Sequence, residues 1–508
     1  MSGRAATSLC STPGRNGPAR PAPPHVRSSL GGGQGVRVVF ATAPVQRRSA
    51  DGASRWPPLA LVHLAGAARA AGHDCQIHDA RSVGGGLEEA VRHVAEARPD
   101  VLCVSALTPD FPDALELCRA AQSQGVVTVV GGIHASFMYP EFLPQGGVDF
   151  SVVGEGEETL PQLLECLESG EDPSRIAGLA FPLGGRIVRT ARRPRLAVLD
   201  PLPTAWDLLD WRPYTWAARP GSRLGAVATS RGCPRPCRSC PQGVSWECTW
   251  RPRSPDAVAY EISQLRRDHG VDVVDLFDDA PTWDAERWKE ILERLIELEL
   301  GVELLVWTRA EDVVRDAGRL ARWRRAGVAH VGMCRDPDEE WPPAGGEEGA
   351  EAVRRAVALL RENGMSSEVG FWLGFPEESP ERVLALQARA REWDPDVAHF
   401  HVVTPWPYTP AWRNLGPHVV TRDYRRFNLV EPVLRVRHMS MEQVAAAVSA
   451  CYRSFYLDRA RRMAATGQAG RTPAPWQQLL GTAFFRERVL DGATEEERRA
   501  FSPGVASA

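Results

Sequence analysis

The sequence predicts an α/β protein in which two successive βα series are followed by a helical C-terminal region. Short β-branched runs alternate with amphipathic stretches from residue 37 to residue 168, and the alternation begins again at 223 and continues to 403. Residues 170–222 interrupt this pattern with a possible hairpin, "GLAFPLGGRIVRT", and a segment rich in proline and tryptophan. We therefore expect two domains joined by a connector.

The first series has the order of a doubly wound parallel sheet of about five strands. Strands are predicted at 37–42, 75–79, 101–106, 126–131 and 149–153, and helices at 58–71, 87–97, 110–124 and 157–168. Glycines and small polar residues follow the strands in "DARSVGGG", "SALTPD", "GGIHAS" and "GEGEET". Because ligands bind beyond the carboxyl ends of such strands, these loops predict a binding site, although glycine-rich strand ends also occur without one.

The second series predicts a partial (β/α)6 barrel with its active site at the carboxyl ends of the strands. Its strands are predicted within 223–232 and at 272–277, 303–307, 329–333, 368–373 and 398–403. Its helices are predicted at 255–269, 284–299, 316–326, 348–364 and 379–392. The predicted units are a disordered leader (1–35), the first domain (36–169), the connector (170–222), the barrel (223–412) and a mostly helical C-terminal domain (413–508).

Composition excludes several classes of protein. A chain of 508 residues with 43% hydrophobic residues can bury several cores. A net charge of -4 argues against nucleic acid or an anionic membrane as the main partner. No apolar run approaches the roughly 18 residues that span a bilayer, and the leader lacks the apolar core of a secretory signal. We expect a cytoplasmic protein without membrane or nucleic-acid partners.

The eleven cysteines are too few for a disulfide scaffold in a chain of this length. Four occur singly in apolar segments and are interpreted as buried thiols: Cys75, Cys103, Cys118 and Cys166. Three others follow the first strand of the second series in "SRGCPRPCRSCPQ": Cys233, Cys237 and Cys240. Only this group looks like a metal-ligand set.

Two metal sites suit three clustered thiols. A structural zinc site would need a fourth ligand, for which Cys248 is available eight residues further on. In a four-iron cluster, by contrast, each thiolate binds one iron and the fourth iron stays open. We favour the cluster, and zinc remains the alternative.

The cysteine loop, at the start of a six-strand barrel, resembles the radical S-adenosylmethionine (SAM) superfamily, in which the open iron chelates SAM. "LFDDAPT", "WTRAEDV", "GFWLGFPEES" and "TPWPYTPAW" resemble its later strand ends. "VVGGIHAS" followed by "VDFSVVGEGEETL" is similar to the branch with an N-terminal, Rossmann-like cobalamin-binding domain. The resemblance covers roughly residues 36–455 and implies a 4Fe-4S cluster, cobalamin and SAM as cofactors.

The resemblance also implies site residues. The metal ligands are Cys233, Cys237 and Cys240. The residues expected to line cobalamin are Ser105, Thr108, Gly131, Gly132, His134 and the 154–157 loop with Gly154, Glu155 and Gly156. The residues expected near SAM are Asp279, Arg309 and Gly374.

Arg81 departs from the family pattern. Many cobalamin domains carry Asp-x-His-x-x-Gly, whose histidine is the lower axial ligand of cobalt, whereas this chain has Asp79, Arg81 and Gly84 at that spacing. A guanidinium has no lone pair to offer to cobalt. We expect Arg81 to leave the lower face open, to favour low cobalt oxidation states and so to assist methyl transfer as a catalytic residue. The alternative is a chance match with Arg81 at the surface.

Cys334 is a second departure. Relatives commonly have Gly-x-Glu after the fourth strand, with the glutamate on the amino group of SAM, but here Gly332 is followed by Cys334. Either Asp336 or Asp338 serves instead, or SAM is held differently. The second possibility would suit polar methyl transfer without the 5′-deoxyadenosyl radical.

The activity implied is that of a methyltransferase in natural-product biosynthesis. It would move a methyl group from SAM via methylcobalamin to a carbon or phosphorus of a small metabolite, with an external electron donor. In a radical route a second SAM yields a radical that abstracts hydrogen; in a polar route the acceptor is nucleophilic, such as an indole carbon of tryptophan. The alternatives are a cobalamin-dependent radical SAM cyclase or ring-rearranging enzyme, and a non-catalytic cobalamin sensor with a structural metal.

Overall fold

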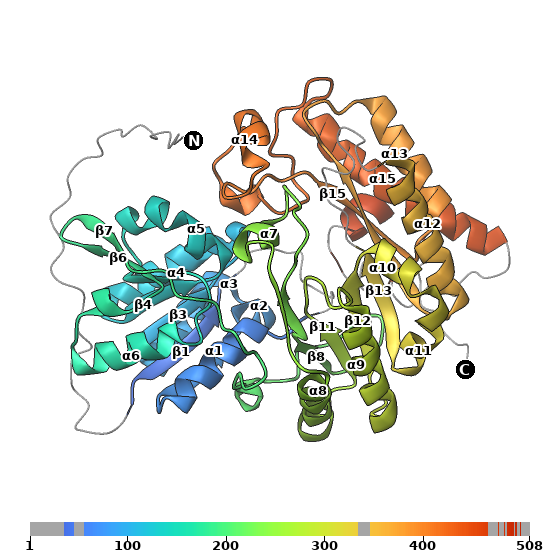
Figure 1. Ribbon diagram of the computed structural model, residues 1–508. Coiled ribbons are helices and arrows are strands. Elements are labelled where there is room, and N and C mark those ends of the chain that lie inside the picture. Colours follow the sequence, from blue (N-terminus) through green and yellow to red (C-terminus); the bar gives the residue numbers. More distant parts are fainter. Residues whose placement is uncertain are drawn as a thin grey trace, which may run out of the picture.

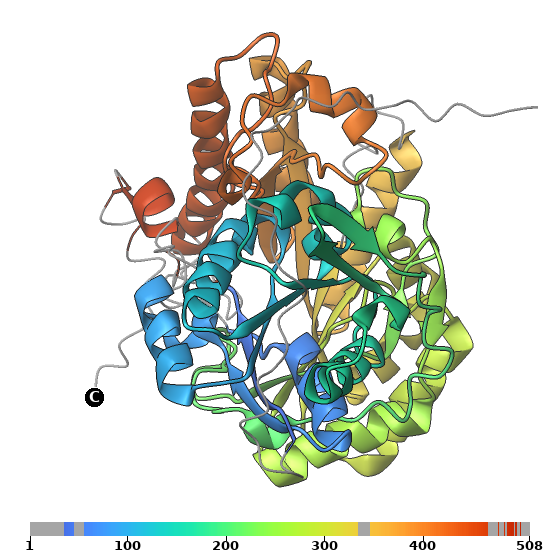
Figure 2. The same cartoon turned by 90° about the vertical axis from the view of Figure 1, so that its left-hand side faces the viewer.

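The computed structural model describes residues 35–44, 55–333 and 346–465, with isolated positions between 476 and 498. Apart from Gly35, the predicted leader lies outside the described residues, as do Cys334, Asp336 and Asp338. The described residues form two large sheets, one in the N-terminal domain and one in the barrel, which stand side by side in Figure 1. Seen from the side in Figure 2, the N-terminal domain lies in front of the barrel.

The first sheet confirms the doubly wound prediction. Its strand order is β2-β1-β3-β4-β5-β6-β7. The parallel strands are β1 (Arg37–Thr42), β2 (Asp74–His78), β3 (Val101–Ser105), β4 (Val127–Gly131) and β5 (Phe150–Val152). Helices α1 (Leu59–Ala70) and α6 (Thr159–Ser169) share one apolar core with the sheet, and α3 (Gly86–Ala97), α4 (Phe111–Ser123) and α5 (Ile133–Phe142) share the other. Both faces are covered, which explains the nearly continuous apolar strands.

The hairpin belongs to this sheet, although it was predicted to lie in the connector. It consists of β6 (Leu179–Leu183) and β7 (Arg186–Arg189), and β6 pairs antiparallel with β5. The reason is apolar packing, because Phe181 on β6 lies 5.5 Å from Phe150 on β5, ring centroid to ring centroid, in the same core. The first domain therefore extends past residue 169.

The second sheet contains six parallel strands in the order β15-β14-β13-β12-β11-β8, as predicted for a partial barrel. They are β8 (Leu224–Val227), β11 (Val273–Leu276), β12 (Glu303–Thr308), β13 (Val328–Met333), β14 (Ser366–Leu373) and β15 (Val397–Val402). The helices of the series are α8 (Pro255–His269), α9 (Ala285–Leu298), α10 (Ala310–Arg315), α11 (Leu320–Arg325), α12 (Gly346–Glu362) and α13 (Pro380–Trp393). Figure 1 shows them along the outer side of the sheet.

The C-terminal region contributes one long helix, α15 (Met441–Ala465), which covers the edge strand β15. The hydroxyl of Tyr456 accepts a hydrogen bond from the backbone N–H of Ala398 and donates one to its carbonyl, at 2.9 and 3.0 Å. These bonds satisfy an edge that would otherwise be open to pairing. The C-terminal region is less helical than predicted. Helix α14 (Trp412–Leu415) is short, and residues 416–440 contain two 3-10 turns and an isolated bridge between Val419 and Leu434 but no α-helix.

No helix within these described ranges combines the length and hydropathy needed to cross a bilayer.

Candidate functional site

The cysteine loop lies at the carboxyl end of the first barrel strand, as predicted. After β8, strands β9 (Ser230–Gly232) and β10 (Trp250–Pro252) form a short antiparallel ribbon, and the loop and α7 (Pro241–Ser245) lie between them. Gly232 has φ +96°, and a Cβ there would lie 2.1 Å from the carbonyl oxygen of Thr249. Only glycine allows the ribbon to close directly before Cys233. Figure 1 shows α7 between the two domains.

None of the three thiols is in a disulfide, and all three are half-buried. Burial raises the pKa of Cys233 and of Cys240, while backbone N–H groups of the loop lower it. No three His, Cys, Asp or Glu side chains within the described ranges are grouped around one point as for a single metal ion. Three thiols on one short loop suit a four-iron cluster, in which each thiolate binds one iron, whereas a closed zinc site would need a fourth ligand.

Asp279, which follows β11, lies near these thiols. Burial by the surrounding protein and the charge of Asp278 raise the pKa of Asp279 to about 6, while Trp246 and the backbone N–H of Gly232 lower it. Asp279 in turn raises the pKa of Cys233 and Cys240, which places the three groups together. The carboxylate keeps accessible surface and can contact a ligand.

Asp278 has a structural role instead. Its carboxylate accepts hydrogen bonds from the backbone N–H groups of Thr229 and Ser230, at 3.0 and 2.6 Å. These bonds tie the end of β11 to the chain that leads into the cysteine loop.

The other two residues predicted near SAM lie at neighbouring strand ends. Arg309 follows β12, and its charge lowers the pKa of Cys233, so it lies on the cysteine side of the barrel. Gly374 follows β14 with φ +84°, and its N–H donates to the carboxylate of Glu378 at 2.9 Å. This turn brings the backbone of β14 to the same edge.

The glycines after β4 and β5 leave room at the carboxyl edge of the first sheet. A Cβ on Gly131 or on Gly154 would meet no atom within 4 Å. Gly132 has φ +101°, and its Cβ would lie 2.8 Å from the carbonyl oxygen of Ala106, so the loops after β3 and β4 pack closely. Ser105, the last residue of β3, pairs with Gly131 across the strand ends. Such an open edge fits a flat ring such as a corrin.

Thr108 and His134 lie behind this edge with protein partners. The Thr108 hydroxyl is 2.9 Å from the hydroxyl of Tyr408 and 3.2 Å from Nδ1 of His134. The His134 ring packs 4.3 Å from that of Phe111, and burial lowers its pKa to about 3, which keeps the imidazole neutral. Their burial suits support of the loop better than direct contact with a ligand.

Glu155, which is predicted to line cobalamin, binds arginines of the barrel, and its contact with cobalamin stays a prediction. Its oxygens lie 2.8 Å from Arg231 and 2.9 Å from Arg251. The reason is electrostatic, since buried guanidinium groups require an acidic partner. Gly156 packs against α1, because a Cβ added at this position would lie 2.8 Å from the side chain of Leu64.

Arg81 lies in the short helix α2 (Ala80–Val83), directly after β2, and pairs with Asp110 after β3. Its side chain is 40% exposed, so a surface residue and a residue at the sheet edge are both compatible with this position. Asp79 accepts hydrogen bonds from the hydroxyls of Thr42 and Tyr214, at 2.7 and 3.0 Å. The carboxylate of Asp79, the first residue of the Asp-x-His-x-x-Gly spacing, therefore already accepts hydrogen bonds from β1 and from the connector.

A polar group inside the barrel was not predicted from the sequence. Glu368 on β14 lies 3.0 Å from Nε2 of His330 on β13 and 2.9 Å from Nε2 of His399 on β15. Burial raises the pKa of Glu368, but the two histidines lower it by a larger amount. The pKa of Glu368 therefore lies well below its usual range. Glu368 also raises the pKa of His399 against the effect of burial.

A signal for this group was available in the sequence. In a strand, residues two apart share a face. The alternation in "AHVGM", "SSEVGFWL" and "AHFHV" therefore places His330, Glu368, His399 and His401 on one face of three adjacent strands.

Comparison with known families agrees with the division into two domains. The chain matches the family described as "B12 binding domain" over residues 49–164. It matches the family described as "Radical SAM superfamily" over residues 227–389.

Proteins similar to this chain include enzymes of more than one kind. The anaerobic magnesium-protoporphyrin IX monomethyl ester cyclase of Rubrivivax gelatinosus is 31% identical over 84% of this chain and 78% of its own length. An uncharacterized methyltransferase of Pyrococcus horikoshii is 28% identical over 79% of this chain and 88% of its own. The fold is similar to that of the radical S-adenosylmethionine methyltransferase TsrM from Kitasatospora setae, solved with cobalamin and a 4Fe-4S cluster (TM-score 0.60, 20% identity, 75% of this chain and 78% of that chain). TsrM has also been solved with tryptophan substrate and a SAM analogue (TM-score 0.57, 21% identity, 74% of each chain).

Proposed function

This chain belongs to the family of radical SAM enzymes that carry a B12-binding domain, and we propose that it transfers a methyl group from SAM to a carbon or phosphorus of a small metabolite. The observation that carries the proposal is the place of Arg81. The segment after β2 presents a guanidinium paired with Asp110 at the position where the Asp-x-His-x-x-Gly motif of many cobalamin domains has its histidine. Cobalamin held there without a histidine ligand would release a methyl group as a cation equivalent more readily, which suits a methyl carrier.

The residues of the two domains have complementary tasks. Cobalamin, when bound, supplies a metal centre that carries the methyl group, and SAM supplies the group. The open edge beside Gly131 and Gly154 leaves room for the ring. Cys233, Cys237 and Cys240 hold the cluster, and Asp279 and Arg309 orient SAM beside it. The positive charge of Arg81 stabilises the less positive states of a metal nearby.

Aromatic side chains at the strand ends favour an apolar, aromatic acceptor. Phe277, directly after β11, is 59% exposed, and Trp283 is 42% exposed beneath the guanidinium of Arg235 at 5.3 Å. Trp372 on β14 packs 5.1 Å from His401. Exposed aromatic side chains beside a site often mark the surface that binds a ligand. Tryptophan, whose indole carbon is nucleophilic, is the acceptor we would test first.

Product mass tests the proposal. The reconstituted enzyme, with cobalamin and methyl-labelled SAM, is incubated anaerobically with tryptophan and other aromatic acceptors, and a Cys233→Ala variant is the control. We expect a labelled product heavier by one methylene group with the parent enzyme alone. An acceptor converted without label would contradict methyl transfer.

Ring formation is the second candidate, because the Rubrivivax cyclase is 31% identical over most of this chain. A cyclase would convert a porphyrin ester to a product that lacks the label from SAM. A non-catalytic sensor gains no support, since the chain belongs to a superfamily of enzymes.

A further inference from the structure

Two arginines of the cysteine ribbon bind the glutamates of the loop after β5. Arg231 lies two residues before Cys233, and its guanidinium contacts Glu155 at 2.8 Å and Glu157 at 2.6 Å. Arg251 contacts Glu155 at 2.9 and 3.0 Å. The two arginines are partners across the β9–β10 ribbon, so together they hold one carboxylate. We call these four residues the interdomain bridge.

The bridge is buried and balanced in charge. Its side chains are 8 to 15% exposed, and two carboxylates face two guanidinium groups. Burial raises the pKa of Glu157, but Arg231 outweighs it and the pKa falls below its ordinary value. Removal of one partner would leave a buried charge unpaired, which is far more costly than the loss of an exposed pair.

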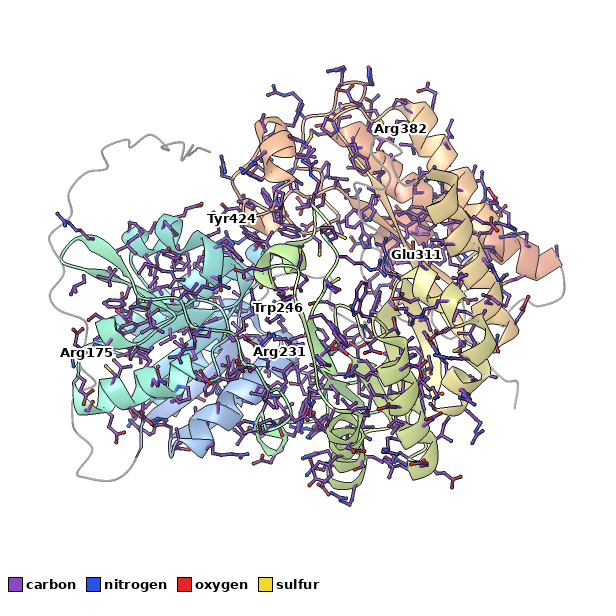
Figure 3. The ribbon with its side chains drawn as sticks, viewed as in Figure 1. Arg175, Arg231, Trp246, Glu311, Arg382 and Tyr424 are labelled. Atoms are coloured by element: carbon purple, nitrogen blue, oxygen red, sulfur yellow. The ribbon has the colours of Figure 1, made fainter. Side chains whose placement is uncertain are left out.

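The bridge continues toward the thiols through Trp246. The guanidinium of Arg251 lies 5.4 Å from the centre of the Trp246 ring, and that of Arg195 lies 5.5 Å from it. Trp246 directly follows α7 (Pro241–Ser245), the helix that begins after Cys240, so its ring connects the bridge to the cysteine loop. In Figure 3, Arg231 and Trp246 lie one above the other where the two domains meet.

We infer that Glu155, Arg231 and Arg251 are positioning residues that fix the cobalamin loop against the cysteine loop and couple the two cofactor sites. This inference rests on the binding of both cofactors in the proposed function, but it does not depend on the methyl acceptor. If the two sites are coupled, binding of cobalamin should change the reduction potential of the cluster, because coupling between two sites is reciprocal. The bridge should transmit that change.

The test measures the reduction potential of the reconstituted cluster by EPR, with and without cobalamin, together with cobalamin affinity. We expect cobalamin to shift the potential in the parent protein. In Glu155→Gln we expect cobalamin binding to weaken at least about tenfold, because Arg231 and Arg251 lose a buried partner. The shift in potential should fall by about half or more in the same variant.

Glu261→Gln is the matched control. Glu261 pairs with Arg253 at similar burial, 7 and 9% exposed, but both residues belong to the barrel domain. This variant should lose stability yet keep the cobalamin affinity and the shift in potential. Equal losses in the two variants, or an unchanged shift in Glu155→Gln, would overturn the inference, as would a parent protein in which cobalamin causes no shift.

Arg251→Lys is a second variant that tests the bridge if Glu155→Gln does not fold. Lysine keeps the charge but loses the planar fork that holds both oxygens of Glu155. Weaker cobalamin binding and a smaller shift support the bridge, and values equal to those of the parent overturn it. Since neither measurement uses a methyl acceptor, failure of the proposed methyl transfer would remain a separate result.

Discussion

Glu368 and His399 form an ion pair within the barrel sheet, with 2.9 Å between the carboxylate oxygen and Nε2. The two residues are 7 and 23% exposed, so they are largely shielded from solvent. His330 binds the other oxygen of Glu368 at 3.0 Å. A protonated His399 beside an ionised Glu368 is therefore the stable arrangement in this part of the fold.

Glu368→Gln should destabilise the protein by about 3 to 5 kcal/mol, since the substitution leaves buried histidines without their anion. Urea unfolding measured by circular dichroism checks this value. Glu351→Gln is the control, because Glu351 forms an exposed pair with Arg354 and should cost less than about 1 kcal/mol. Equal losses in the two variants would contradict the role of Glu368.

The same pair gives stability a defined pH dependence. The pKa of Glu368 lies below its ordinary value of 4.5, so its contribution is present above 4.5 and is lost as pH falls through the folded value. The pKa of His399 lies above its ordinary value of 6.5, so its contribution is present below 6.5 and is lost as pH rises through the folded value. The difference in unfolding free energy between the parent and Glu368→Gln should be largest between pH 4.5 and pH 6.5, where both contributions are present. A difference independent of pH would exclude the charged pair.

The cluster should depend on each of three thiols. Alanine at Cys233, Cys237 or Cys240 should abolish the iron-sulfur absorbance after anaerobic reconstitution, because each thiolate binds its own iron. Cys248→Ala should keep the full iron content, since the Cys248 thiol lies 3.6 Å from the backbone carbonyl of Arg235 and is not needed as a ligand. A loss of iron in Cys248→Ala would make Cys248 a fourth ligand of the cluster, and zinc in place of iron in the parent protein would support the zinc alternative.

Arg81→His should introduce a nitrogen ligand to cobalt. We expect nitrogen splitting in the EPR spectrum of the bound Co(II) form of this variant, and none from protein histidine in the parent. Methyl transfer should then slow by about tenfold, which corresponds to about 1.4 kcal/mol in the barrier. Arg81→Ala is the control for loss of the guanidinium alone, and an unchanged spectrum in Arg81→His would place residue 81 away from the ring.

The sequence predicted the strands well because each parallel strand is a short β-branched run buried on both faces. The parallel strands of both sheets begin within two residues of their predicted starts, with β8 inside the predicted 223–232, and Cys75, Cys103, Cys118 and Cys166 are buried as expected. The hairpin after residue 178 was harder to place, because only its packing against Phe150 decides which sheet it joins.

The site was predicted less completely, because long-range charge pairing leaves little trace in local sequence. Glu155 belongs to a glycine-rich loop typical of ligand binding, and its partners Arg231 and Arg251 are 76 and 96 residues away. The polar positions of β13, β14 and β15 could have been recognised from their alternation. Nothing in the sequence says that His330, Glu368 and His399 meet in one cluster.

Anaerobic turnover with methyl-labelled SAM, with both labelled product and 5′-deoxyadenosine quantified, tests the central claim most directly. With an aromatic acceptor whose carbon is nucleophilic, the account predicts that label reaches the product while no 5′-deoxyadenosine accumulates. Conversion of the acceptor without label would contradict methyl transfer, and 5′-deoxyadenosine formed in proportion to labelled product would contradict the polar route.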